Sequence, residues 1–206
     1  MIVDNIAYPN PFQDEEFQEF LDMLELIHKP DAVPEPRIRK CWSMFQLAKA
    51  ANGGCIVELG TWRGYGAIAL WYGTQLGYGV AVHSVDLFSS RNGWAGEQYG
   101  QEDKASFDRN VEICGAHIDL EIGDFIDVSR TWVEQVALLV WDGGTYSMPV
   151  DIDAWRRHVI PGGVIAIHDT PDYKLCGDRY VRQLMKSGYI SAEVMPGTLI
   201  AVKKGS

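Results

Sequence analysis

The most constraining feature of this sequence is the run from Cys55 to Gly73, which reads CIVELGTWRGYGAIALWYG. It predicts a short buried strand that ends near Glu58, then a glycine-rich turn, then a small apolar helix. A carboxylate at the end of a buried strand loses hydration and needs a hydrogen-bond donor in return. Glycines at a helix start let a ligand approach backbone N–H groups. The run therefore predicts a nucleotide-like ligand at the carboxyl edge of a parallel sheet.

Strands and helices alternate along the rest of the chain. Strands are expected at residues 55–59, 79–85, 119–122, 137–141 and 164–167, with helices at 66–76, 103–114, 129–135, 150–158 and 178–187. Such alternation predicts a parallel sheet with helices on both faces. The last two expected strands, 189–195 and 198–202, are joined by Pro196-Gly197, which predicts an antiparallel hairpin at the edge. We therefore expect an α/β fold with a seven-stranded, mostly parallel sheet.

Two segments outside this alternation are candidate lids. Residues 1–36 contain a helical stripe at 15–28 and form a predicted N-terminal extension, with the main domain at 37–206. That helix is expected either to pack into the core, to close over the site, or to contact a second copy in a homo-oligomer. The glycine-punctuated, aromatic segment 88–101 is expected to be a loop that overhangs the site.

Composition excludes several classes of function. The chain has 206 residues, of which 47% are hydrophobic, which is enough for one domain with a core. Its net charge of -10 makes nucleic-acid binding an unfavourable reading, and no apolar run approaches the ~18 residues that span a bilayer. Four cysteines without a C-x-x-C pair exclude a thiolate zinc knuckle. The sequence starts without a basic n-region, so we expect a cytoplasmic protein with reduced thiols.

Five successive predicted strands end in an acid, namely Glu58, Asp86, Asp124, Asp142 and Asp169. One such acid is often a turn or helix-capping residue. Five at one edge of a sheet indicate a ligand site instead. A nicotinamide-dependent oxidoreductase also places an acid after its second strand, but its glycine pattern is G-x-G-x-x-G, whereas this turn reads G-x-x-x-G-x-G.

The turn E-x-G-T-W-x-G and the later run WDGGTYSMPVDIDAWRRHVIPGGVIAIHDT together resemble class I S-adenosylmethionine-dependent methyltransferases. The likeness extends over about residues 37–203 and is to the group that includes macrocin-type sugar O-methyltransferases and cephalosporin-hydroxylase-like proteins. It implies the Rossmann-like class I methyltransferase fold. It also implies that Glu58 lies near the methionine ammonium of S-adenosylmethionine. The other implied cofactor contacts are Gly60, Thr61 and Gly64 in the turn, Asp86 and Leu87 at the ribose, Asp124 and Phe125 at the adenine, and Asp142.

The same resemblance implies a divalent cation, usually magnesium, on Asp142 and Asp169 with His168 beside them. A sugar hydroxyl is a weak acid, and a hard dication such as Mg²⁺ or Mn²⁺ lowers its pKa. These three residues are therefore both the predicted metal ligands and the predicted catalytic group. The function expected is metal-assisted O-methylation of a small hydroxylated acceptor, such as a sugar, a glycoside or a similar natural product.

The sequence departs from this group directly after Asp142. The group has D-G-D-H-x-Y there, whereas this chain has Asp142-Gly143-Gly144-Thr145-Tyr146, without the second acid and the histidine. The general base is therefore open between Asp142, His168 and a water on the metal. The departure also motivates an alternative, in which the chain is a catalytically degenerate nucleoside-binding protein of the same fold.

Overall fold

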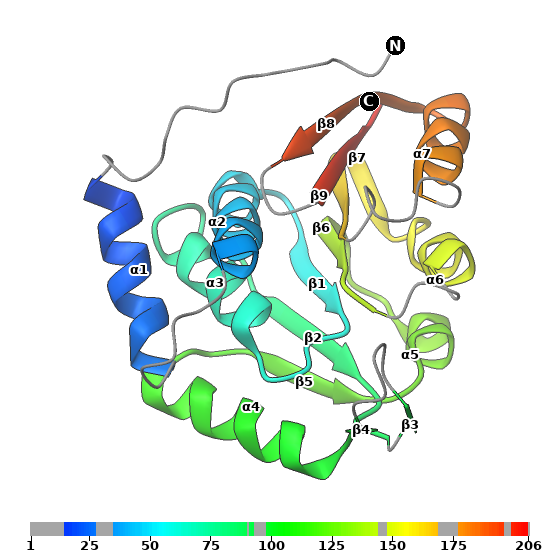
Figure 1. The fold of residues 1–206 in the computed structure, drawn as a ribbon. Helices are drawn as coiled ribbons and strands as arrows, with labels where there is room; N and C mark the ends of the chain where they lie inside the picture. Colours follow the sequence, from blue (N-terminus) through cyan, green and yellow to red (C-terminus); the bar gives the residue numbers. More distant parts are fainter. Residues whose placement is uncertain are drawn as a thin grey trace.

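A central sheet organises the molecule, with helices packed on both of its faces (Figure 1). The computed structural model describes residues 15–27, 35–89, 91–92, 98–143, 148–168, 177–195 and 199–205. The seven strands lie in the order β5-β2-β1-β6-β7-β9-β8. Their bounds are β1 Cys55–Leu59, β2 Val82–Asp86, β5 Asp119–Ile122, β6 Val136–Trp141, β7 Val159–Ile167, β8 Tyr189–Met195 and β9 Leu199–Lys204.

Pairing within the sheet confirms the predicted architecture. Strand β1 pairs in parallel with β2 and β6, while β2–β5 and β6–β7 are parallel too. Strand β9 runs antiparallel to both β7 and β8, so the final hairpin forms one edge. The carboxyl ends of the five parallel strands β5, β2, β1, β6 and β7 therefore meet along one side of the sheet, which is where ligands bind in open α/β folds.

Helices divide into two layers (Figure 1). One layer holds α1 Glu15–Ile27, α2 Glu35–Ala50, α3 Tyr65–Gln75 and α4 Gln101–Cys114. The other holds α5 Phe125–Thr131, α6 Met148–Trp155 and α7 Gly177–Lys186. The central strands β1 and β6 are covered on both faces, and all five residues of β1 and all six of β6 are buried. Among the described residues, no helix is both long enough and apolar enough to cross a lipid bilayer.

Helix α1 packs into the core through the stripe that the sequence predicts. Phe17 and Phe20 are 1% and 0% exposed, and their rings contact Trp42 of α2 at centroid distances of 5.0 and 5.3 Å. Aromatic contacts of this kind add to the free energy gained by burying the rings. In this structure α1 is thus a core element, and its movement as a lid stays a prediction.

Three elements differ from the sequence-based expectation. Helix α5 begins at Phe125 rather than at residue 129, because Asp124 caps it. Strand β7 begins at Val159 and includes the Pro161-Gly162-Gly163 run that we expected to precede it, since a register shift between β6 and β7 absorbs these residues. The expected loop at 88–101 contains the two-residue strands β3 Arg91–Asn92 and β4 Gln98–Tyr99, and its residues 90 and 93–97 lie outside the described part.

Candidate functional site

Four of the five predicted strand-end acids lie along the carboxyl edge of the sheet. Glu58 is the second-last residue of β1, and Asp86 is the last residue of β2. Asp124 follows β5, and Asp142 follows β6. Two backbone bonds extend the ladder past the strand ends, from the Asp142 N–H to the Leu59 carbonyl (2.8 Å) and from the His168 N–H to the Trp141 carbonyl (3.1 Å). Asp169 lies outside the described residues.

Glu58 is a buried carboxyl group, with 1% of its surface exposed. The Ser84 hydroxyl on the neighbouring strand donates to its Oε2 at 3.1 Å. Burial, reinforced by the negative charge of Asp142, raises the pKa of Glu58 to about 8. The carboxyl group is therefore largely protonated at neutral pH in this structure.

Asp86 organises the loops on either side of it. Its Oδ2 accepts the backbone N–H groups of Thr61 and Trp62, both at 2.9 Å, and its Oδ1 accepts that of Phe88 at 3.0 Å. Trp62 and Phe88 have φ angles of 49° and 42°, which cost free energy in a residue with a side chain. Leu87, the neighbouring predicted cofactor contact, is half-buried. A carboxylate accepts about four hydrogen bonds, so these three leave acceptor capacity on Asp86, and its predicted contact with the ribose stays a prediction.

Two glycines of the turn are needed because other protein atoms lie where their side chains would be. Gly60 has φ +92°, and a Cβ there would lie 2.7 Å from the carbonyl oxygen of Asp142. A Cβ at Gly66 would lie 2.1 Å from Glu58 Oε1. Both glycines thus let the turn pack against the ends of β1 and β6. Their role in exposing backbone to a ligand, which the sequence suggested, stays a prediction.

Asp142 forms the most tightly paired group at this edge. The Lys40 ammonium lies 2.6 Å from its Oδ2, and His168 Nδ1 lies 2.7 Å from its Oδ1. The three side chains are only 14–16% exposed. They come from α2, from the end of β6 and from the end of β7, so the fold brings together residues 40, 142 and 168.

Charge pairing controls protonation in this group. Burial by itself would raise the pKa of Asp142, but the charges of Lys40 and His168 outweigh burial and hold that pKa well below its usual range. Burial likewise would lower the pKa of Lys40, yet Asp142 outweighs it and the pKa of Lys40 is raised. Asp142 is therefore a carboxylate and Lys40 an ammonium ion across the physiological range.

Helix α2 supplies two cations that the sequence analysis did not identify. Lys40 pairs with Asp142, and the Arg37 guanidinium, one turn earlier, lies 5.0 Å from the centre of the Trp62 ring in the glycine-rich turn. The available signal was their spacing of three residues, which places both on one helix face. A basic residue on an amphipathic helix is usually solvated, however, so only the tertiary packing distinguishes Lys40 from its neighbour Arg39.

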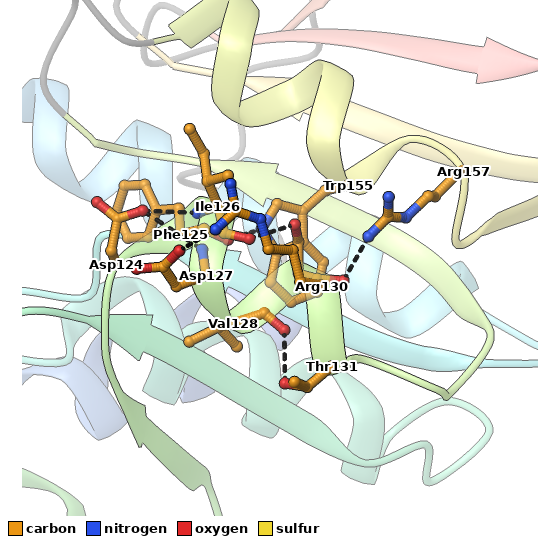
Figure 2. A network of polar contacts seen from close by, with 10 residues as sticks. Asp124, Phe125, Ile126, Asp127, Val128, Arg130, Thr131, Trp155 and Arg157 are labelled. Carbon is orange, nitrogen blue, oxygen red and sulfur yellow. Dashed lines mark hydrogen bonds and ion pairs between the residues drawn. The ribbon is translucent and has the colours of Figure 1, made fainter.

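Asp124 is a helix cap in this structure. Its Oδ1 accepts the backbone N–H groups of Ile126 at 2.9 Å and Asp127 at 3.4 Å, at the start of α5 (Figure 2). Phe125 follows it, and its carbonyl accepts the indole N–H of Trp155 at 2.8 Å. The predicted contacts of Asp124 and Phe125 with an adenine stay predictions.

As placed, the described residues around Asp142 do not fit a divalent cation. Both oxygens of Asp142 already face positive or hydrogen-bonding partners, and the Lys40 ammonium stands where a cation would bind Oδ2. The nearest second carboxyl group among those described, Glu58, is largely protonated. A metal ion would have to displace Lys40 and use Asp169, which the structure does not describe.

Comparison with known proteins agrees with this architecture. A family model for the methyltransferase domain matches residues 57–170, more than half of the chain. No curated protein matches the sequence significantly.

Solved structures with the same fold include methyltransferases. The SAH-bound methyltransferase PaMTH1 of Podospora anserina is 14% identical, with a TM-score of 0.63 over 99% of this chain and 100% of that one. The O-methyltransferase from Bacillus cereus in complex with SAH is 17% identical, with a TM-score of 0.58 over 97% and 94%. TomG from Streptomyces achromogenes, an O-methyltransferase in complex with SAM, is 16% identical, with a TM-score of 0.57 over 93% and 91%. At these identities the likeness concerns the fold alone. Because the family match includes the strand–turn–helix unit as well as Asp86, Asp124 and Asp142, the chain belongs to the methyltransferase domain family and has the class I fold.

Proposed function

We propose that this protein transfers a methyl group from S-adenosylmethionine to a hydroxyl oxygen of a small acceptor. The observation that carries the proposal is the buried Lys40–Asp142–His168 group at the carboxyl edge of the sheet. Structures with this fold include O-methyltransferases in complex with SAH or SAM, which supports the choice of cofactor. A hydroxyl acceptor is proposed because His168 can take its proton as a base, and the positive charge of Lys40 can stabilise the oxygen that remains.

Buried polar atoms at the glycine-rich turn fit this cofactor. Glu58 Oε1 and Thr61 Oγ1 are buried, and among the described residues neither makes a hydrogen bond of good geometry, although the Thr61 side chain lies close enough to Glu58 to lower its pKa against the effect of burial. Such an unsatisfied group costs about 1–3 kcal/mol, which a ligand donor recovers. The ammonium of the methionine moiety is a donor of this kind. Its positive charge would also lower the pKa of Glu58 and convert it into a carboxylate.

The side chains around Asp142 suit the removal of a proton from an acceptor hydroxyl. Bound S-adenosylmethionine supplies an electrophilic methyl group on a sulfonium centre. The acceptor oxygen forms its bond to carbon as the sulfur–carbon bond breaks, and the hydroxyl proton must leave. With Nδ1 turned toward Asp142, a neutral His168 keeps its proton on that nitrogen and has Nε2 as its basic atom. Asp142 fixes this tautomer and stabilises the imidazolium that forms.

Lys40 supplies positive charge that the sequence-based account assigned to a metal ion. Its ammonium is held 2.6 Å from Asp142 and is largely excluded from solvent, where charge acts more strongly than in water. In the proposal it stabilises the negative charge that develops on the acceptor oxygen. Assistance by Mg²⁺ or Mn²⁺ on Asp142 and Asp169 is the competing version of the same function.

The proposal is tested by a methyl-transfer assay over a panel of sugars, glycosides and phenols, with product detected by mass spectrometry. We expect a gain of one methyl group on at least one class of acceptor, and the same rate in EDTA as in magnesium. Loss of activity in EDTA, restored by magnesium, would support the metal version. His168→Ala should lower turnover by about 100-fold or more, with cofactor affinity nearly unchanged.

The nucleoside-binding alternative rests on the shortened motif that follows Asp142. Residues 144–147 lie outside the described part, so the geometry there does not weigh on the choice. Turnover separates the two functions. A protein that binds S-adenosylhomocysteine with micromolar affinity yet methylates no member of the panel would be the degenerate binder.

A further inference from the structure

A second cluster of ligand-type side chains lies at the opposite edge of the sheet. Cys55 begins β1, His83 is the second residue of β2, and Glu134 precedes β6. One ligand atom from each of these side chains lies within 4.8 Å of the others. Cys55 is three residues before Glu58 on the same strand, which is about 10 Å along a strand, so this cluster is separate from the candidate methyl-transfer site.

Strand register explains why these residues meet. His83 pairs with Val57, so Cys55, two residues before Val57, faces the same side of the sheet. Glu134 is held close by, because the Cys55 N–H donates to the carbonyl of Gln135 at 2.8 Å. The cluster therefore joins β1, β2 and the connection between α5 and β6.

His83 lies between two carboxylates with a nitrogen that lacks a partner. Its side chain is 10% exposed, and its ring meets Trp132 edge-on at 4.9 Å. Nε2 is buried and has no hydrogen-bond partner in the described part of the chain. Glu134 Oε1 is 3.6 Å from Nε2 and Asp119 Oδ2 is 3.7 Å from Nδ1, both beyond hydrogen-bonding distance. A buried ring nitrogen left without a partner beside a thiol and a carboxylate has the surroundings of an unfilled coordination position.

We propose that Cys55, His83 and Glu134 bind a zinc-type transition-metal ion. Thiolate sulfur, imidazole nitrogen and carboxylate oxygen are the donors that zinc takes, commonly as three protein ligands with a water in the fourth position. Glu134 is 54% exposed, so the fourth position opens to solvent. His83 Nε2 is the metal-binding nitrogen, since it faces Glu134. Nδ1 faces Asp119, which orients the ring as carboxylates do for many metal-bound histidines.

Charge in the cluster favours a cation. Glu134 and Asp119 bring two carboxyl groups to the same side of the sheet as His83 and Cys55. Metal binding takes the Cys55 sulfur as a thiolate, and the thiol proton is released to solvent. The ion joins three separate segments at the amino edge of the sheet, and its effect is to stabilise the fold rather than to take part in methyl transfer.

Cobalt(II) titration of the metal-free full chain tests the site, because cobalt replaces zinc and reports a thiolate ligand through a near-ultraviolet charge-transfer band. We expect that band with one equivalent of cobalt, its loss on adding zinc, and a higher melting temperature with zinc. Cys55→Ser should remove the band. Glu134→Gln, an exposed change that leaves the core intact, should weaken cobalt binding by at least about tenfold.

Matched controls separate this site from adventitious binding. Cys114→Ser removes a half-buried thiol outside the cluster, and Glu121→Gln removes an exposed acid of β5, so both should keep wild-type affinity and spectrum. Asp119→Asn should weaken binding while keeping the charge-transfer band. The proposal is overturned if cobalt gives no thiolate band, or if Glu134→Gln binds cobalt as tightly as the wild-type chain does.

Discussion

At the scale of single residues, the candidate site depends on how charges are paired. The Lys40 ammonium lies 2.6 Å from one oxygen of Asp142, and His168 Nδ1 lies 2.7 Å from the other. Because all three side chains are mostly buried, removing one partner leaves another charge without compensation. The pairing also decides the chemistry, since it fixes the histidine tautomer and holds a cation at the end of β6.

Lys40→Met should therefore lower the free energy of unfolding by about 3 kcal/mol, because Asp142 is left buried and unpaired. The double variant Lys40→Met/Asp142→Asn should recover much of this loss, since it removes both charges. Chemical denaturation of the two variants and of Asp142→Asn forms the double-mutant cycle. A strictly additive cycle would contradict the pairing seen here.

Asp86 gives the second prediction at this scale. Asp86→Ala removes the acceptor for three backbone N–H groups, two of them in residues with positive φ. We expect the free energy of unfolding without ligand to fall by about 2 kcal/mol or more. The free energy of unfolding should fall less in Asp86→Asn, because the amide keeps one acceptor oxygen. Urea titration in the absence of cofactor makes the comparison, and equal stability of Asp86→Ala and wild type would show that these bonds contribute little.

Sequence reasoning found the acids but not their partners. Glu58, Asp86, Asp124 and Asp142 are recognisable because each follows an apolar run. Lys40 is not, because its helix carries several basic residues and the sequence does not show which of them faces a strand end. The bonds from Asp86 to the glycine-rich turn were also not predictable, because the curvature that aims two N–H groups at one oxygen is a property of backbone angles.

At the scale of elements, helix α5 begins at a residue, Asp124, that is also a predicted ligand contact. Two hydrogen bonds hold the helix that Asp124 caps. The indole N–H of Trp155 donates to the Phe125 carbonyl at 2.8 Å, and the Arg157 guanidinium donates to the Ser129 carbonyl at 2.7 Å (Figure 2). These bonds join α5 to α6 and its following turn. The expected start at residue 129 is four residues late because a strand-end acid such as Asp124 can be either a ligand contact or a helix cap, and the sequence does not separate the two.

Asp124→Ala should lower the free energy of unfolding by about 1 kcal/mol, the usual value of an N-cap. Asp124→Ser keeps a capping oxygen and should stay close to wild type in stability. If Asp124 also contacts the adenine, Asp124→Ser will bind S-adenosylhomocysteine more weakly despite its stability. Thermal melting and calorimetry on the same two variants separate capping from ligand binding.

At the scale of the whole molecule, the number and direction of the strands followed from the alternation of apolar runs with amphipathic ones. The seven-stranded sheet with its antiparallel edge is as predicted. Element ends were less predictable, because the start of β7 depends on a register shift against β6 and not on local composition. The likeness to the methyltransferase group was detectable because its motifs lie at strand ends, where this fold places its ligands.

Stability should depend on pH through Glu58. Its pKa is raised from 4.5 to about 8 on folding, so the folded state holds a proton that the unfolded state releases. The stabilisation is fully present below pH 4.5 and is lost as the pH rises through about 8. We expect the free energy of unfolding to fall over that range, and to fall less in Glu58→Gln. Parallel denaturation curves at several pH values check this, and identical pH profiles would contradict the assignment.

Binding of S-adenosylhomocysteine is the most direct test of the central claim that this edge of the sheet holds the cofactor of a methyltransferase. Titration calorimetry at pH 7 in buffers of different ionisation enthalpy measures both affinity and proton release. We expect a Kd in the micromolar range, which corresponds to a binding free energy of about -8 kcal/mol. We also expect release of a proton, because the ligand ammonium converts Glu58 into a carboxylate. Glu58→Gln should bind more weakly and release no proton. Strong binding of NAD⁺ with no heat from S-adenosylhomocysteine would contradict the account.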